Sequence, residues 1–85
     1  MNITQMGAMK NHLHNLRVPL SGLCDSIVRR MNEWQKADGD GFAGKWRDSE
    51  AYQHLETALI KAREAERALN DAMTRLDYEK DHYGE

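Results

Sequence analysis

The sequence has few of the residues and patterns that define the commonest kinds of functional site. Its 85 residues include one cysteine and one proline, which excludes an internal disulfide and a metal site built from several cysteines. It has no run of about 18 apolar residues, and its first ten residues lack the apolar core of a secretory signal. We therefore expect a cytoplasmic protein without a membrane-spanning segment, and leaderless secretion stays open.

The chain is also short of apolar residues for a domain that folds alone. Apolar residues make up 40% and charged residues 31% of the sequence, whereas an average globular domain is roughly 45–50% apolar. A compact monomer of this size buries only ~60% of the surface that its unfolded chain exposes. We expect a single domain, residues 1–85, that has no large enclosed active site and needs a partner.

Charge is divided unevenly between the two halves of the chain. The net charge of −2 favours neither nucleic acid nor membrane. Residues 1–37 carry five basic and two acidic side chains, a net of +3, and residues 38–85 carry seven basic and twelve acidic side chains, a net of −5. Halves of opposite sign attract each other when they lie side by side.

The first half has the apolar periodicity of a helix. Spacings alternate between three and four residues, which predicts a helix over about 3–37 and not a strand. The expected inward row is Met6, Met9, Leu13, Leu16, Leu20, Leu23 and Ile27, continued by Trp34. Asn2 and Gln5 have the spacing of a capping box. Pro19 predicts a kink, with a break as the alternative, because an interior proline removes a backbone hydrogen bond.

A glycine-rich turn over about 38–47 separates this helix from a second one. The second helix is expected over about 48–80, capped by Asp48 or Ser49, with a frayed tail over 81–85. Its expected inward row is Leu55, Ala58, Ala62, Ala65, Leu69, Ala72 and Leu76. Alanines recur every seven residues at Ala51, Ala58, Ala65 and Ala72. This row is expected to face the first helix closely, because alanine allows a short distance between helix axes.

Two helices of similar length joined by a short turn predict an all-α antiparallel hairpin. A second apolar stripe is expected beside the seam, and a hairpin alone would leave it in water. Burying it against another copy predicts a homodimer that forms a four-helix bundle of the coiled-coil type. The expected dimer interface consists of Ile3, Met31, Tyr52, Leu59 and Met73.

No residues have the pattern of a catalytic, metal or cofactor site. Asp38 and Asp40 begin like a calcium loop, but Ser49 stands where that pattern requires glutamate. Glu79 and His82 form a single Glu-x-x-His unit, whereas a di-iron site needs two such units and further carboxylates. We therefore expect no catalytic residues, no cofactor and no metal.

Three aromatic residues, Trp34, Phe42 and Trp46, gather near the turn. They either close the end of the hairpin or form an aromatic site for a protein partner. Five basic residues lie in the same region: Arg29, Arg30, Lys36, Lys45 and Arg47. These favour nucleic acid as an alternative ligand, but nearby acidic residues cancel much of the field that phosphate binding requires.

The segment Trp46-Arg47-Asp48-Ser49-Glu50-Ala51-Tyr52, followed by a helix rich in alanine and leucine, resembles the region after the turn in WXG100 (ESAT-6-like) proteins. The resemblance in length and layout covers nearly the whole chain. It implies a helical hairpin that dimerises and travels through type VII secretion. Asp48 stands where that family has its motif glycine, and Tyr78 is followed by His82 where the export signal has an acidic residue.

These observations predict a non-enzymatic protein–protein interaction module that binds a partner through its helical surface or its aromatic turn. Three alternatives remain: a WXG100-like secreted protein or chaperone of type VII secretion, a small phage-type inhibitor of a host protein, and a nucleic-acid-binding protein.

Overall fold

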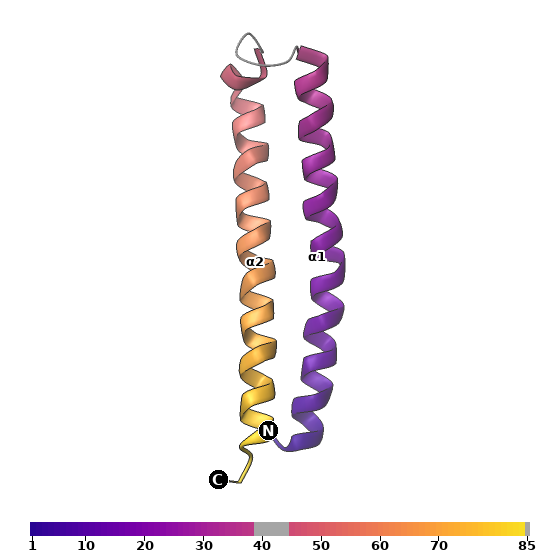
Figure 1. Ribbon diagram of the computed structural model, residues 1–85, viewed down its shortest axis with the longest axis vertical. Helices are drawn as coiled ribbons and strands as arrows, with labels where there is room; N and C mark the ends of the chain where they lie inside the picture. The colour runs from indigo at the N-terminus through magenta and orange to yellow at the C-terminus, as the bar shows by residue number, and fades with distance from the viewer. Residues whose placement is uncertain (39–44, 85) are drawn as a thin grey trace.

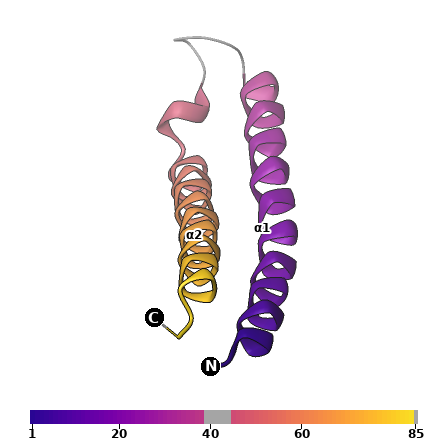
Figure 2. The same ribbon diagram turned by 60° about the horizontal axis from the view of Figure 1, so that its bottom comes forward.

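The computed structural model describes residues 1–38 and 45–84, which form two long antiparallel helices (Figure 1). Helix α1 spans Ile3–Asp38, a short 3-10 helix η2 spans Lys45–Asp48, and α2 spans Glu50–Asp81. Both ends of the chain lie at the end opposite the turn (Figures 1 and 2). The described residues contain no strand. The predicted all-α helical hairpin is therefore confirmed.

Both long helices start at side-chain caps. The backbone N–H of Gln5 donates to Asn2 Oδ1 at 2.8 Å, and the N–H of Asn2 donates to Gln5 Oε1 at 2.9 Å. This is the reciprocal capping box that the sequence predicts. At the start of α2, Ser49 Oγ accepts from the N–H of Tyr52 at 3.2 Å. Ser49 is therefore the cap, and Asp48 ends η2.

Pro19 lies in the interior of α1, and the helix continues through it without a break. Proline lacks the N–H that would bond to the carbonyl of Asn15, four residues earlier. Pro19 and Asn15 are both exposed, so water can hydrogen-bond that carbonyl. The alternative of a break at Pro19 is therefore excluded, and α1 is one continuous helix, as expected.

The core of the protein is the seam between α1 and α2. Its centre is a buried cluster of Cys24, Ile27, Leu59 and Ala62. The buried or half-buried seam positions of α1 are Met6, Lys10, Leu13, Arg17, Leu20, Cys24, Ile27, Met31 and Trp34. Those of α2 are Tyr52, Leu55, Leu59, Ala62, Glu66, Leu69, Met73 and Leu76. Spacings alternate between three and four residues along both sets, as in a coiled coil.

The helices turn a different face inward from the one expected. Met9, Leu16 and Leu23 are 39%, 59% and 51% exposed, and Lys10, Arg17, Cys24 and Met31 take their places in the seam. On α2 the four alanines of the seven-residue repeat are all exposed. The prediction that this alanine row faces the first helix is therefore wrong. On α2, Tyr52, Leu59 and Met73 take the places of alanines in the seam, and burying these larger side chains removes more apolar surface from water than burying alanines.

The stripe expected to form a dimer interface is for the most part inside the hairpin. Tyr52 and Leu59 are buried, with 2% and 7% of their surface exposed, and Met73 is half-buried in the seam. Met31 packs against the central cluster. Ile3, at 44% exposed, is the one member of the five that lies on the surface. The prediction that this stripe lies beside the seam is therefore wrong.

Candidate protein-binding face

Three hydrogen bonds join side chains of α1 to side chains of α2. They run from Lys10 Nζ to Asp77 Oδ2 (2.8 Å), from Arg17 Nη1 to Asn70 Oδ1 (2.9 Å) and from Gln35 Nε2 to Tyr52 Oη (2.7 Å). The second bond lies seven residues after the first on α1 and seven residues before the first on α2. The bonds therefore fix one constant antiparallel register along the hairpin.

The face opposite these bonds carries two apolar rows. We call Met9, Leu16 and Leu23 the leucine row, Ala51, Ala58, Ala65 and Ala72 the alanine row, and the two rows together the open face.

The rows share one face because of helix geometry. Two steps along an α-helix turn a side chain by roughly 200°. Ala72 follows Asn70 by two residues, so it points away from the side where Asn70 bonds to α1. Leu23 follows Ser21 by two residues, and Ser21 lies in the same heptad row as Gln35, whose side chain bonds to Tyr52 of α2. Leu23 therefore also points away from the side of the hairpin that carries these bonds.

The register sets members of the two rows at the same heights. The bond between Arg17 and Asn70 places Leu16 beside the level of Ala72. One heptad further along α1, Leu23 stands near the level of Ala65. Large side chains therefore line one half of the open face and small ones the other half.

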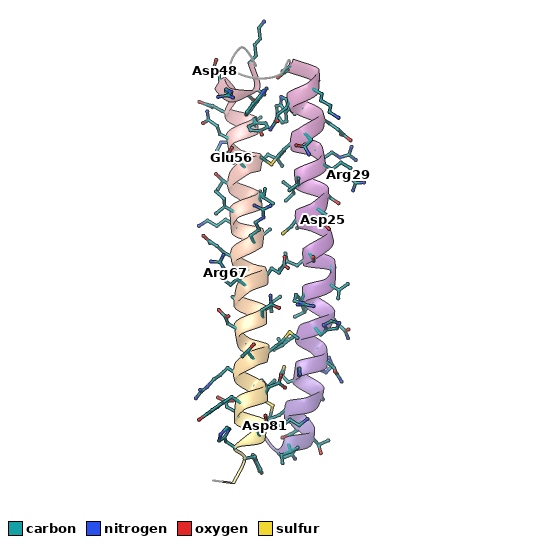
Figure 3. The ribbon with its side chains drawn as sticks, in the orientation of Figure 1. Asp25, Arg29, Asp48, Glu56, Arg67 and Asp81 are labelled. Carbon is teal, nitrogen blue, oxygen red and sulfur yellow. The ribbon has the colours of Figure 1, made fainter. Side chains whose placement is uncertain are left out.

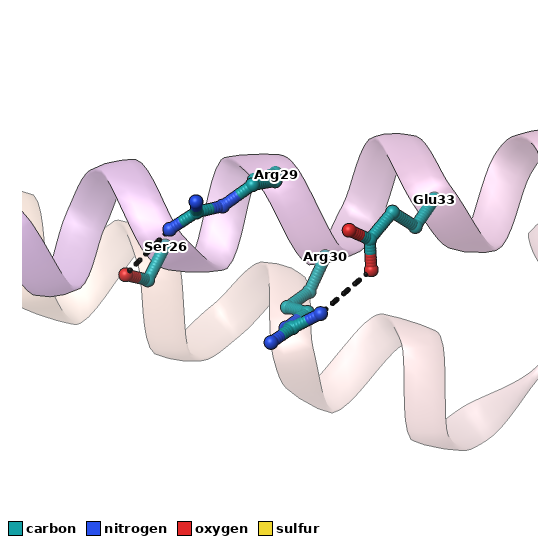
Figure 4. A network of polar contacts seen from close by, with 4 residues as sticks. All are labelled: Ser26, Arg29, Arg30 and Glu33. Carbon is teal, nitrogen blue, oxygen red and sulfur yellow. Dashed lines mark hydrogen bonds and ion pairs between the residues drawn. The ribbon is translucent and has the colours of Figure 1, made fainter.

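Charged side chains bound the open face at its ends. The leucine row leads to Arg30, which forms an ion pair of 2.9 Å with Glu33 on the same helix (Figure 4). The alanine row leads to Glu79, which pairs with Arg75 at 3.5 Å. By the same register Arg30 stands near the level of Ala58 and Glu79 near the level of Met9, and the row positions between these two levels, Leu16, Leu23, Ala65 and Ala72, carry no charge.

The aromatic residues near the turn pack around Tyr52. Its ring lies 5.6 Å from the ring of Trp34, edge to face, and 4.8 Å from the ring of Trp46. Trp34 Nε1 also donates to Asp38 Oδ2 at 3.0 Å. The two described tryptophans therefore stabilise the turn end of the hairpin. Phe42, the third predicted member of an aromatic partner site, lies outside the described residues.

Basic side chains near the turn also have intramolecular partners. Arg29 Nη2 donates to Ser26 Oγ at 3.3 Å, beside the pair of Arg30 with Glu33 (Figure 4). The guanidinium of Arg47 lies 4.9 Å from the centre of the Trp46 ring. Arg29 itself projects outward from the hairpin, as do Glu56 and Arg67 on α2 (Figure 3).

Cys24 is buried at the centre of the seam. Burial raises the pKa of its thiol, and the Glu66 carboxylate beside it raises that pKa further. A raised pKa keeps the sulfur protonated at neutral pH, and the protonated form is a poor nucleophile. An open hollow of about 350 Å³ on α2 is lined by Arg63, Glu66, Arg67 and Asn70. Across residues 1–38 and 45–84, no three His, Cys, Asp or Glu side chains are placed to hold a metal ion.

Comparison of the chain with protein-family models, with curated proteins and with solved structures finds no match in any of the three. Within the two described ranges, neither helix combines the length and apolar character needed to cross a bilayer.

The apolar periodicity of the sequence does not show which face of each helix turns inward, but the polar residues of the two helices do carry a signal for it. Apolar residues recur in three adjacent heptad rows on each helix, with charged residues at some positions, so two inward faces come close to satisfying the same spacing rule. Lys10 and Arg17 stand where their long stems can line a seam and their charged ends can reach Asp77 and Asn70. Matching these polar pairs across an antiparallel hairpin would have identified the leucine row as exposed.

Proposed function

We propose that this chain is a non-enzymatic protein-binding module and that the open face is its binding surface. The observation that carries the proposal is the exposure of Leu16 and Leu23, 59% and 51%, in an apolar face whose end charges are paired. Scattered exposed leucines are ordinary on protein surfaces, whereas contiguous apolar patches mark interaction sites. Leu16 and Leu23 stand at the levels of Ala72 and Ala65, and these four exposed side chains together make such a patch.

The thinness of the hairpin supports the same proposal. Its radius of gyration is 18.7 Å, whereas a compact domain of this length has about 12 Å. Its accessible surface is 6315 Å², and a compact monomer of 9.8 kDa exposes only about 5,200 Å². A two-helix layer has no second layer to cover its outer apolar rows. A bound protein would supply that layer.

Site-specific photocrosslinking in the cell that produces the protein tests this proposal. A photoreactive amino acid replaces Leu23 in one variant and Val18 in the control. Val18 is 54% exposed on the same helix but follows Leu16 by two residues, so it points away from the open face. Both variants keep the seam intact and differ in the face that carries the probe.

We expect a discrete crosslinked protein product from position 23 and none from position 18. Equal products from both positions, or no product from position 23, would contradict the proposal. The mass of the product also identifies its origin, because a crosslink between two copies has twice the mass of the chain.

A further inference from the structure

We infer that the partner of the open face is a second copy of this chain, related by a two-fold axis parallel to the helices, with both turns at the same end. This inference rests on the proposed function and names the partner of the same surface. In this arrangement α1 of each copy lies on α2 of the other. The four helices then form a closed bundle in which the open faces are buried.

The shape of the open face favours this arrangement. A two-fold axis parallel to the helices brings the leucine row of one copy onto the alanine row of the other. Leu16 then meets the region of Ala72, and Leu23 meets the region of Ala65, because each pair already stands at the same height within one copy. Large side chains opposite small ones interdigitate at native packing density. A two-fold axis perpendicular to the helices would instead place the leucine row of one copy on the leucine row of the other. The two alanine rows would then face each other across a gap.

The distribution of charge favours the same axis. Helix α1 has five basic and three acidic side chains, a net of +2, and α2 has five basic and eight acidic side chains, a net of −3. With the turns at the same end, every helix has neighbours of the opposite net charge on both sides. With the turns at opposite ends, α1 would lie on α1 and α2 on α2. Like charges facing each other disfavour that association.

The length of the hairpin allows a second copy to pack along it. The hairpin measures 61 Å by 18 Å, so a second copy lying along its whole length would face a projected area of roughly 1,100 Å², whereas a standard interface buries about 800 Å² from each partner. The alanine row also allows the helices of two copies to approach closely. Three properties of the face, its size, its shape and its charge, therefore fit a second copy.

Distance measurement between spin labels tests the inference. A nitroxide is attached to cysteine in the variant Lys45→Cys, combined with Cys24→Ala so that no other thiol reacts. Position 45 is exposed in η2, at the turn end of the hairpin. Circular dichroism confirms that the labelled chain stays helical, and sedimentation equilibrium of the unlabelled natural chain accompanies the measurement.

We expect a short distance between two labels, comparable with the 17–18 Å thickness of the hairpin and far below its 61 Å length. Adding Leu23→Glu removes this distance, because the dimer would bury an unpaired carboxylate, and weakens association roughly a hundredfold. Adding Val18→Glu leaves the distance unchanged.

Two results would overturn the inference. A label distance near the full length of the hairpin would show turns at opposite ends. A natural chain that sediments as a monomer at micromolar concentration, with no distance between labels, would exclude a second copy. In that case a crosslink from position 23 to a different protein leaves the proposed function standing, whereas the absence of any crosslink there removes both.

Discussion

The hydroxyl of Tyr52 accepts a hydrogen bond of 2.7 Å from Gln35 Nε2, across the seam near the turn. The Tyr52 ring lies between Trp34 of α1 and Trp46 of η2. One buried side chain thus connects the end of α1, the 3-10 helix and the first turn of α2. The aromatic residues near the turn stabilise the hairpin through this residue.

Two substitutions separate the polar and the packing contributions of Tyr52. Tyr52→Phe removes the hydrogen bond and should lower the free energy of unfolding by about 0.5–1.5 kcal/mol. Tyr52→Ala also empties the space between the tryptophans and should lower it by about 3–5 kcal/mol. Urea unfolding followed by circular dichroism measures both values. Equal effects of the two substitutions would show that the ring contributes nothing beyond its hydroxyl.

A matched pair of alanines tests the observed register. Ala62 is buried in the central cluster, and Ala65 is exposed on the open face. With Leu23→Glu present to keep the chain monomeric, Ala62→Leu should overpack the seam and lower the free energy of unfolding by about 1–3 kcal/mol. Ala65→Leu should change it by no more than about 0.5 kcal/mol. If urea unfolding showed a larger loss for Ala65→Leu than for Ala62→Leu, the alanine row would lie in the seam and the observed register would be wrong.

The sequence predicts the two helices, their caps and their antiparallel pairing, because these depend on local signals. The reciprocal spacing of Asn2 and Gln5 and the position of Ser49 are such signals, and the structure contains the corresponding hydrogen bonds. Which face of each helix turns inward depends on which of two possible seams packs better between the helices. Local sequence signals do not show this, because it depends on contacts between residues far apart in the chain. In the observed seam Tyr52 and Leu59 are buried, and they remove more apolar surface from water than the alanines of the competing seam would.

The ion pair between Lys10 and Asp77 should contribute little to stability. Its two side chains keep 40% and 46% of their surface exposed, so water and salt screen the attraction. Asp77→Asn should lower the free energy of unfolding by about 0–1 kcal/mol, with a smaller effect in 1 M salt. Unfolding at low and high salt measures both values. A larger loss that persists at high salt would mean that the pair is effectively buried.

Cys24 should react slowly with thiol reagents while the protein is folded. Burial and Glu66 raise the pKa of its thiol, so the reactive thiolate is scarce at neutral pH. The rate of iodoacetamide alkylation should reach half its maximum at a higher pH in the folded chain than in urea. Because the pKa is higher when folded, this thiol's contribution to stability is complete at neutral pH and is lost as pH rises through the alkaline range. Equal pH profiles in the two states would contradict this assignment.

The claim that the open face joins this chain to a second copy is tested most directly by sedimentation equilibrium of three proteins: the natural chain, Leu23→Glu and Val18→Glu. The two substituted side chains are similarly exposed, 51% and 54%, so neither should alter the hairpin itself. We predict that the natural chain and Val18→Glu are dimers at micromolar concentration and that Leu23→Glu is a monomer. A Leu23→Glu protein that dimerises as tightly as Val18→Glu would contradict the claim.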